Sequence, residues 1–386
     1  MVESFDHAVV GLGALGSATA YELSRRGHSV VGLERFELGH HRGASHDTSR
    51  ILRHSYHTPE YVRLTVEAYD DWARLEEAGG EPLVTVVGGL DLFPPDPAIP
   101  LADYVRSLGE VGIDHELLDR DEIVARWPQL ALPDGTTGLF QDRGAIVPAG
   151  RGTAFLQSLA AGHGAVLRAH APVTAVTDHG AAGIEVRAGG TTYRCGTVVV
   201  CADAWTNDVL GHLGHHVPLT VTLEQATYFA PPDPASFAPG RMPLWIWMDE
   251  PSYYGFPCYG EPTVKAAQDC GGPAVDPEDR TSEPDEEMLA RLAGHVARTL
   301  PGAGRPVRSL RCQYTLTPDR DFVVDRVPGH ENVVVGLGAA HGFKFAPTLG
   351  RILADLADGE RDSGSATFSL TRPALTDPAH EAHWVV

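Results

Sequence analysis

The sequence predicts an α/β protein in which a parallel-sheet domain is assembled from both chain ends and a second domain is inserted between them. Two observations predict this fold. The chain opens as strand, glycine-rich turn, helix and strand, which is a βαβ unit and therefore implies a parallel sheet. A buried strand followed by a helix returns near the carboxyl end. A length of 386 residues leaves room for two or three domains.

The opening elements follow from local patterns. Residues 7–10 are a short apolar strand, and the glycines that begin at residue 11 break it. Apolar side chains then recur at helical spacing over 14–26, and Gly27 ends this helix. Residues 29–33 form a second buried strand that closes at Glu34. Together these segments predict the first βαβ unit.

The later elements are less regular. Strands are predicted at 197–201, 253–256 and 332–337, and helices at 286–299 and 348–356. Pro347 suits the first turn of the last helix. Proline- and glycine-rich stretches at 94–100 and 231–240 indicate loops. We assign one domain to 1–85, 145–215 and 310–386, and an α+β domain with a mixed or antiparallel sheet to 86–144 and 216–309.

Composition excludes several classes of function. Apolar residues make up 43% of the chain, which is enough for a substantial core. The net charge of −21 argues against binding nucleic acid or an anionic membrane, because phosphate contacts need a basic face. No apolar stretch approaches a membrane span and no secretion signal is visible, so a cytoplasmic location is expected. Five scattered cysteines without a CxxC pair predict neither disulfides nor a metal site.

The segment 11–16 reads GLGALG and stands between the first strand and the first helix. Its glycines permit a tight turn, the approach of a pyrophosphate and close packing of helix on strand. Glu34 can accept hydrogen bonds from ribose hydroxyls, which disfavours a 2′-phosphate. The pattern therefore predicts a Rossmann-like site for NAD or FAD and does not choose between them.

Further segments carry a resemblance to a known family. They read GASHDTSRILRH at 43–54, RCQYT at 311–315 and HGFKFAP at 341–347. Supporting segments are ADAW at 202–205, YYGFP at 253–257, Lys265, and TRPAL at 371–375. Taken in order with the glycine turn, they resemble the family of monomeric sarcosine oxidases and N-methyltryptophan oxidases, over nearly the whole chain.

The resemblance implies a Rossmann-like FAD domain, a sheet-based substrate domain and a monomer. It implies oxidation of the C–N bond of a secondary amino acid, N-methyl or similar, to an imine, with O2 reduced to hydrogen peroxide. It also implies that FAD is covalently attached through Cys312. The residues expected to contact FAD are Gly11, Gly13, Leu15, Gly16, Glu34, Arg35, Ser45, Thr48, Val173, Trp205, Cys312, Gly342 and Lys344.

The resemblance also implies roles at the reacting end. Arg53 and Lys344 would hold the substrate carboxylate, and Tyr254 would line the substrate pocket. The residues expected to act in catalysis are Lys265 for the reaction with oxygen, Arg50 and His341 beside the flavin, Tyr314 in the pocket, and Asp269. If 50–53 were helical, both arginines would share a face. The helix after Pro347 would direct its positive end toward the flavin.

Two positions depart from the family pattern. Asp269 stands where sarcosine oxidases place a histidine, and it brings a negative charge that would suit a more cationic substrate. Asp203 replaces a glycine. An oxidase of a cyclic, pipecolate-like amino or imino acid in a specialised pathway is therefore an alternative. An NAD-dependent dehydrogenase and a flavin-binding module without turnover are two others.

Overall fold

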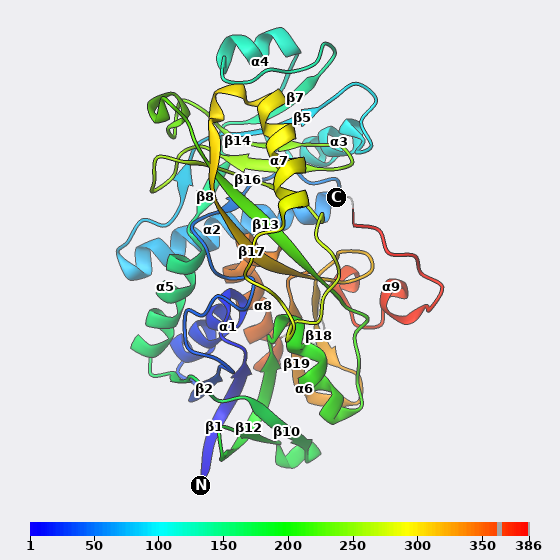
Figure 1. Ribbon diagram of the computed structural model, residues 1–386. Coiled ribbons are helices and arrows are strands. Elements are labelled where there is room, and N and C mark those ends of the chain that lie inside the picture. The colour runs from blue at the N-terminus through cyan, green and yellow to red at the C-terminus, as the bar shows by residue number, and fades with distance from the viewer. Residues whose placement is uncertain (361–364, 385–386) are drawn as a thin grey trace.

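The computed structural model describes residues 1–360 and 365–384, and its strands form three sheets in this part of the chain. The first sheet lies at the amino-terminal end of the molecule, at the bottom of Figure 1. Its strands β1, β2, β9, β12 and β19 pair in parallel, while β10, β11 and β18 add antiparallel edges. The strands are β1 (Val2–Val10), β2 (Val30–Leu33), β9 (Val166–Arg168), β10 (Val173–Asp178), β11 (Ile184–Ala188), β12 (Thr191–Val200), β18 (Val323–Val327) and β19 (His330–Leu337).

Both faces of this sheet are buried, as expected for parallel strands. Successive residues of strand β12 point to opposite faces of the sheet and enter different hydrophobic cores. Val199 packs with helices α1 (Ala14–Arg25), α5 (Ala149–Gly162) and α8 (Ala346–Ala357). Its neighbour Val200 faces β10, β11 and helix α6 (Thr206–Leu210). The helix α1 contacts both α5 and α8.

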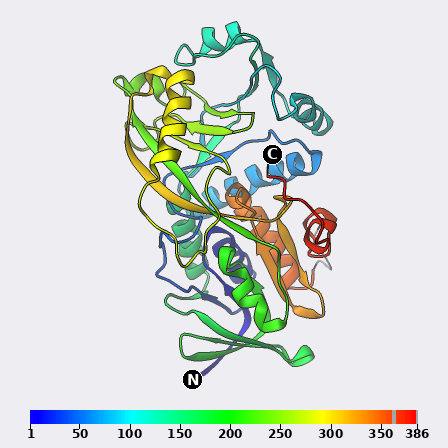
Figure 2. The ribbon, with the colours of Figure 1, turned by 45° about the vertical axis from the view of Figure 1, so that its right-hand side comes forward.

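The second sheet is mixed, because β14 pairs in parallel with β5 and the other pairs are antiparallel. In order across the sheet, its strands are β17 (Arg305–Leu316), β13 (Thr220–Ala230), β16 (Val264–Gln268), β15 (Tyr253–Phe256), β14 (Leu244–Trp247), β5 (Gly89–Phe93), β7 (Thr137–Gln141) and β6 (Glu116–Leu118). Helices α4 (Arg120–Arg126) and α7 (Glu286–Thr299) bury their apolar residues against it. The long strands β13 and β17 reach from this sheet toward the first one (Figures 1 and 2).

A third, small sheet joins β3 (Arg50–Leu52), β8 (Ala145–Val147) and β4 (Thr85–Val86). The long helix α2 (Pro59–Gly79) lies between the two larger sheets in Figure 1. It starts with a proline, and Gly80, with φ +66°, ends it. The remaining helices are α3 (Leu101–Val111) and α9 (Pro373–Thr376). Within the described ranges, the structure contains no helix long and apolar enough to cross a membrane.

The predicted fold class, a parallel-sheet domain built from both chain ends plus a domain with a mixed sheet, is confirmed. Two details differ. Residues 50–52 are extended in β3 and not helical, because this segment pairs with β8, and Arg53 follows the strand. The first strand begins at Val2 and not at residue 7. Its first residues alternate between exposed and half-buried positions, so they do not form the continuous apolar run from which the strand was predicted. The predicted domain boundary at residue 310 lies within strand β17. The domain boundaries stay a prediction.

Candidate active site

The glycine turn between β1 and α1 excludes side chains at two positions. Gly11 has a φ of +90°, and a Cβ there would stand 2.4 Å from the carbonyl oxygen of Cys201. A Cβ on Gly16 would lie 1.9 Å from the Gly11 oxygen, so only glycine lets α1 pack against the turn. The Ala14 N–H donates to Ser45 Oγ at 3.0 Å. The turn thus gathers backbone N–H groups at the positive end of a helix, an arrangement that binds phosphate.

Glu34 fixes the same turn from the end of β2. Its carboxylate accepts hydrogen bonds from the backbone N–H groups of Leu12 at 2.9 Å and Phe36 at 3.0 Å, and His40 Nε2 lies 3.3 Å away. Burial alone would raise the pKa of Glu34, but these hydrogen bonds outweigh it and lower the pKa. The group is therefore ionised at neutral pH, and Oε2, which accepts only from Leu12, keeps a lone pair for a ribose hydroxyl.

A cavity of about 1150 Å³ extends from this turn to β17. It is larger than the roughly 300–1,000 Å³ pockets that hold drug-sized ligands, so a dinucleotide fits its size. The predicted cofactor residues that line it are Gly11, Gly13, Leu15, Glu34, Arg35, Ser45, Thr48, Val173, Trp205, Cys312 and Gly342. Gly16 packs behind the turn, and Lys344 is not part of the wall among the described residues.

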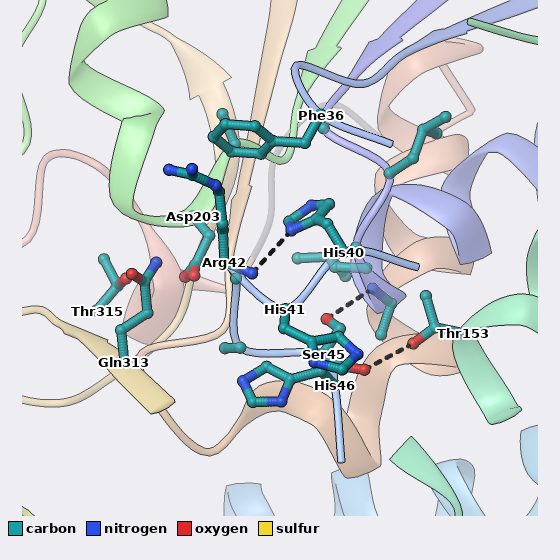
Figure 3. A pocket seen from close by; sticks show the side chains of 18 of the residues that line it. Phe36, His40, His41, Arg42, Ser45, His46, Thr153, Asp203, Gln313 and Thr315 are labelled. Carbon is teal, nitrogen blue, oxygen red and sulfur yellow. Dashed lines mark hydrogen bonds between the residues drawn. The ribbon is translucent and has the colours of Figure 1, made fainter. Parts of the chain in front are cut away.

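Several buried polar atoms on the wall have no hydrogen-bond partner in the described part of the chain. They are His46 Nε2, Asp203 Oδ2, Gln313 Nε2 and Thr315 Oγ1. Figure 3 shows Asp203, Gln313 and Thr315 together on one side of the cavity. Thr315 and Gln313 lie close enough to Asp203 to oppose the rise in its pKa that burial causes. None of the three atoms makes a well-formed hydrogen bond, however, and because buried polar groups are normally paired, a polar ligand such as the hydroxyl-rich chain of FAD fits them.

One end of the cavity is aromatic. The rings of Phe36 and Trp205 lie edge to face with centroids 5.3 Å apart, and the Arg35 guanidinium stands 5.5 Å above Trp205. Val173 lines the same cavity. A planar base is accommodated by such a wall, because aromatic faces and guanidinium groups both stack on rings. This end, next to Glu34, suits the adenosine half of FAD.

Cys312 lies on β17 in the cavity wall, paired across the ladder with Glu224. Burial raises the pKa of the Cys312 thiol to about 11, although the nearby Arg50 lowers it. Burial also raises the pKa of Glu224 to about 7, despite hydrogen bonds from Thr222 and two backbone N–H groups. What distinguishes Cys312 from the buried Cys195, Cys201 and Cys258 is that it is partly exposed and lines the cavity.

Lys265 contacts the cavity wall through Asp47. Its Nζ lies 2.6 Å from Asp47 Oδ2 and donates to the Ser49 carbonyl at 3.1 Å. Burial lowers the pKa of Lys265, and Asp47 opposes this change. Burial would raise the pKa of Asp47, but Lys265 and Arg50 lower it. The result is a buried ammonium in a fixed position, with only 4% of the residue exposed.

Arg53 and Lys344 form a buried cationic pair. Arg53 Nη1 donates to Asp91 Oδ1 at 2.8 Å, and Lys344 Nζ donates to the Tyr56 hydroxyl at 2.9 Å and to the His341 carbonyl at 3.1 Å. Burial, then repulsion by Arg53, holds the pKa of Lys344 well below its usual range. An anionic ligand would relieve this repulsion, so the pair is suited to a carboxylate.

Asp269 forms a two-pronged ion pair with Arg320. The two guanidinium nitrogens of Arg320 donate to the Asp269 oxygens at 2.7 and 2.9 Å, and one also donates to the Trp384 carbonyl at 2.7 Å. Arg320 is 5% exposed. The ion pair offsets the negative charge on which the expectation of a more cationic substrate rested. Arg320 thereby fixes the position of both Asp269 oxygens.

Replacing Arg320 with Met is expected to destabilise the protein. Asp269 would become a largely buried carboxylate without its counter-ion, which costs about 3 kcal/mol. Unfolding in urea measures this loss. The double variant with Asp269→Asn as well should recover part of it, because the uncompensated charge is then removed. An Arg320→Met protein as stable as its parent would contradict the assignment.

The remaining predicted residues gather around the same end. The hydroxyls of Tyr254 and Tyr314 lie 3.4 Å apart, and Tyr314 lines the cavity. His341 Nε2 lies 3.0 Å from the Arg320 carbonyl oxygen. Arg50 also lines the cavity and donates to the carbonyls of Ser49, Ala44 and His46. It therefore holds the 44–49 loop in shape.

Sequence reasoning missed the partners of these groups: Asp47, Tyr56, Asp91, Glu224 and Arg320. Asp47 was within reach, since it lies inside the 43–54 segment. Asp91 could have been flagged as a charge at the centre of an apolar strand, Gly89–Phe93. Nothing in the sequence pairs Arg320 with Asp269, because 51 residues separate them.

Comparisons with known proteins agree with this geometry. A family model described as FAD dependent oxidoreductase matches residues 6–356. Monomeric sarcosine oxidase of Streptomyces avermitilis is 37% identical over 92% of this chain and 94% of its own. N-methyl-L-tryptophan oxidase of Salmonella agona is 30% identical over 95% and 99%. NikD, described as an unusual amino acid oxidase essential for nikkomycin biosynthesis, has a TM-score of 0.85 at 29% identity, over 99% of this chain and 100% of its own. The predicted resemblance and the dependence on FAD are confirmed.

Proposed function

Since the chain belongs to the FAD dependent oxidoreductase family, we propose that it oxidises a secondary amino acid, N-methyl or similar, at its C–N bond. One observation carries the proposal: the buried cations Arg53 and Lys344 repel each other, and the chain neighbours of Lys344, Phe343 and Ala346 among them, line the dinucleotide cavity. A carboxylate held there would place the adjoining C–N bond beside the cofactor. The product is an imine, which water hydrolyses.

The chain's own residues bind and orient the substrate. Arg53 is held by Asp91 and Lys344 by Tyr56, so both positive charges are in place before the substrate arrives. This preorganisation lowers the entropic cost of placing the reacting bond. The half-buried Tyr314 lines the cavity, and its hydroxyl lies 3.4 Å from that of Tyr254. Fixed dipoles thereby replace water around the reacting atoms.

When bound, FAD supplies the acceptor for the two electrons that leave the C–N bond. We propose O2 as the final acceptor, with two electrons and two protons reducing it to hydrogen peroxide. The fixed ammonium of Lys265, bound by Asp47 and the Ser49 carbonyl, would stabilise negative charge as it develops on oxygen. Low exposure strengthens that effect, because solvent does not screen the charge.

A cyclic secondary amino or imino acid, pipecolate-like, is the second candidate substrate. Asp269 favours it: this carboxyl group stands four residues beyond Lys265, and Arg320 fixes its position. A carboxyl oxygen can accept a hydrogen bond from the ring N–H of such a substrate. The buried Tyr56, bonded to Lys344, closes the same region.

A substrate panel tests both candidates. Peroxide formation is measured with sarcosine, N-methyltryptophan, pipecolate and proline, alongside matched primary amino acids. Turnover of a secondary amino acid, with flavin bleaching in the absence of O2, supports the proposal. A protein that bleaches with no member of the panel contradicts it. A colourless protein that reduces NAD would favour the dehydrogenase that the glycine turn alone allowed.

The covalent link through Cys312 has a direct test. After acid precipitation of the native protein, the yellow colour is expected to stay with the polypeptide. With Cys312→Ala, the colour should move to the supernatant as free FAD, because the thioether sulfur is gone. Cys258→Ala is the matched control, since Cys258 is buried outside the cavity wall and should leave the colour in the pellet. Free FAD from the native protein would refute the link.

We also propose that the enzyme is a monomer and that it works in the cytoplasm. The first rests on the resemblance, and the second on cysteines that are all unpaired, as is usual in a reducing compartment. Sedimentation of the FAD-loaded protein at several concentrations tests the first. A mass that stays near 41.3 kDa is expected. Neither nucleic acid nor a membrane surface is expected as a partner of so acidic a chain.

A further inference from the structure

Two histidines and an aspartate converge at the end of the first sheet that is remote from the cavity. His7 lies on β1, His28 in the turn before β2, and Asp358 at the end of α8. Asp358 Oδ1 stands 3.2 Å from His7 Nε2 and 3.1 Å from His28 Nε2. These three atoms lie within 4.8 Å of one another. Three segments distant in sequence thus direct one donor atom each to a single point.

The contacts are not hydrogen bonds. Asp358 Oδ1 is buried and receives none from any residue that the structure describes, although two imidazole nitrogens are within reach. The two rings stand edge to face, at 89°, so their nitrogens approach the oxygen from different directions. A tetrahedral ion with bonds of about 2.0–2.1 Å keeps its ligand atoms about 3.3 Å apart. The nitrogen–oxygen distances are close to that spacing.

The surrounding charge favours a cation. Asp358 Oδ2 accepts from Arg26 at 2.9 Å, but Arg26 also contacts Glu22, Asp355 and Glu360. One arginine therefore faces four carboxylates. Arg25 pairs with Glu22 and offsets one of them. The remaining negative charge attracts a divalent ion to the histidine–aspartate cluster.

We propose that His7, His28 and Asp358 form a binding site for one divalent transition-metal ion, with Zn²⁺ as the probe. Two imidazoles and a carboxylate are ligands that Zn²⁺ takes, and a water completes four-coordination. The site is open to solvent at His28, whose side chain is 35% exposed, whereas the side chains of His7 and Asp358 are each 7% exposed. The ion exchanges from solvent on that side.

The site would stabilise the fold and take no part in the oxidation. Ala346, at the start of α8, lines the cavity, whereas Asp358 follows its last turn. A helix of 12 residues is about 18 Å long, so the ion would lie far from the cavity. It would fasten α8 to β1 and to the turn before β2, which lie at the bottom of Figure 1.

Zinc binding to the FAD-loaded protein tests the proposal. The protein is freed of metal with a chelator, and Zn²⁺ uptake is titrated in competition with a chromophoric chelator. One more equivalent is expected in the parent than in His28→Gln, and Zn²⁺ should raise the Tm of the parent only. Co²⁺ should give a d–d spectrum that His28→Gln lacks. His212→Gln is the matched control, because His212 is exposed and lies outside the cluster.

Two results would overturn the proposal. One is equal Zn²⁺ uptake by the parent and His28→Gln, which would mean adventitious binding at other histidines. The other is a parent that takes up no ion. Asp358→Asn is a second, independent variant that should also lose one equivalent of bound Zn²⁺. The Co²⁺ spectrum of the folded variant should lose its d–d bands as well. Because neither variant touches the cavity, the flavin spectrum should be unchanged, and the result does not depend on the proposed oxidation.

Discussion

Replacing Lys265 with Met is expected to slow the reaction of the reduced enzyme with O2 by about 10²–10³-fold, the range for removing one preorganised charge or donor from a developing anion. Lys265 is buried and fixed by Asp47 and Ser49, so the positive charge is lost with no water to replace it. Met keeps the length of the side chain. Stopped-flow absorbance separates the two half-reactions: flavin reduction by substrate should change much less than reoxidation.

Lys265→Arg is the matched control, since it keeps the charge and should retain much of the reoxidation rate. Asp47→Asn is a second comparison, because it keeps the lysine and weakens its placement. Equal slowing of both half-reactions in Lys265→Met would mean that the lysine supports the site's structure and not the oxygen reaction. Loss of FAD from Lys265→Met would likewise mean that the lysine supports the structure of the site.

Replacing Lys344 with Met should lower kcat/KM by about 10- to 150-fold, since a hydrogen bond to a charged group contributes roughly 1.5–3 kcal/mol. The loss should fall mainly on substrate binding, because Lys344 and Arg53 are the cations suited to the carboxylate. Steady-state peroxide formation measures it. With an amine substrate that lacks a carboxylate, kcat/KM should differ far less between the parent and Lys344→Met. A KM unchanged from the parent would contradict the role.

The same lysine predicts a pH dependence. Burial and the nearby Arg53 lower the pKa of Lys344, so its charged form is lost as pH rises through that lowered value. In the parent, kcat/KM for a carboxylate substrate should therefore fall on the alkaline side earlier than an ordinary lysine would cause. Lys344→Arg should remove that limb, because a guanidinium stays charged. If kcat/KM of Lys344→Arg still falls on the alkaline side at the same pH, the titration of another group causes that fall.

The sequence alone determined the opening βαβ unit and its cofactor site. The glycine spacing, the helical period after it and the acid at Glu34 are local features, and local sterics decide them. Gly11, Gly13, Leu15 and Glu34 accordingly line the cavity. The family resemblance added the residues around the reacting end, such as Cys312 and Lys265.

Tertiary structure decided which charges meet. Arg53 pairs with Asp91, Asp269 with Arg320, and Lys265 with Asp47, across separations that no sequence period encodes. A buried charge is stable only with a partner, so these pairs set the net charge at the substrate end. Residues 50–52 show the same limit, because pairing with β8, and not the spacing of the two arginines, makes them extended. Local chemistry fixes elements and turns, whereas packing fixes the partners of buried ions, because only the folded chain brings distant strands together.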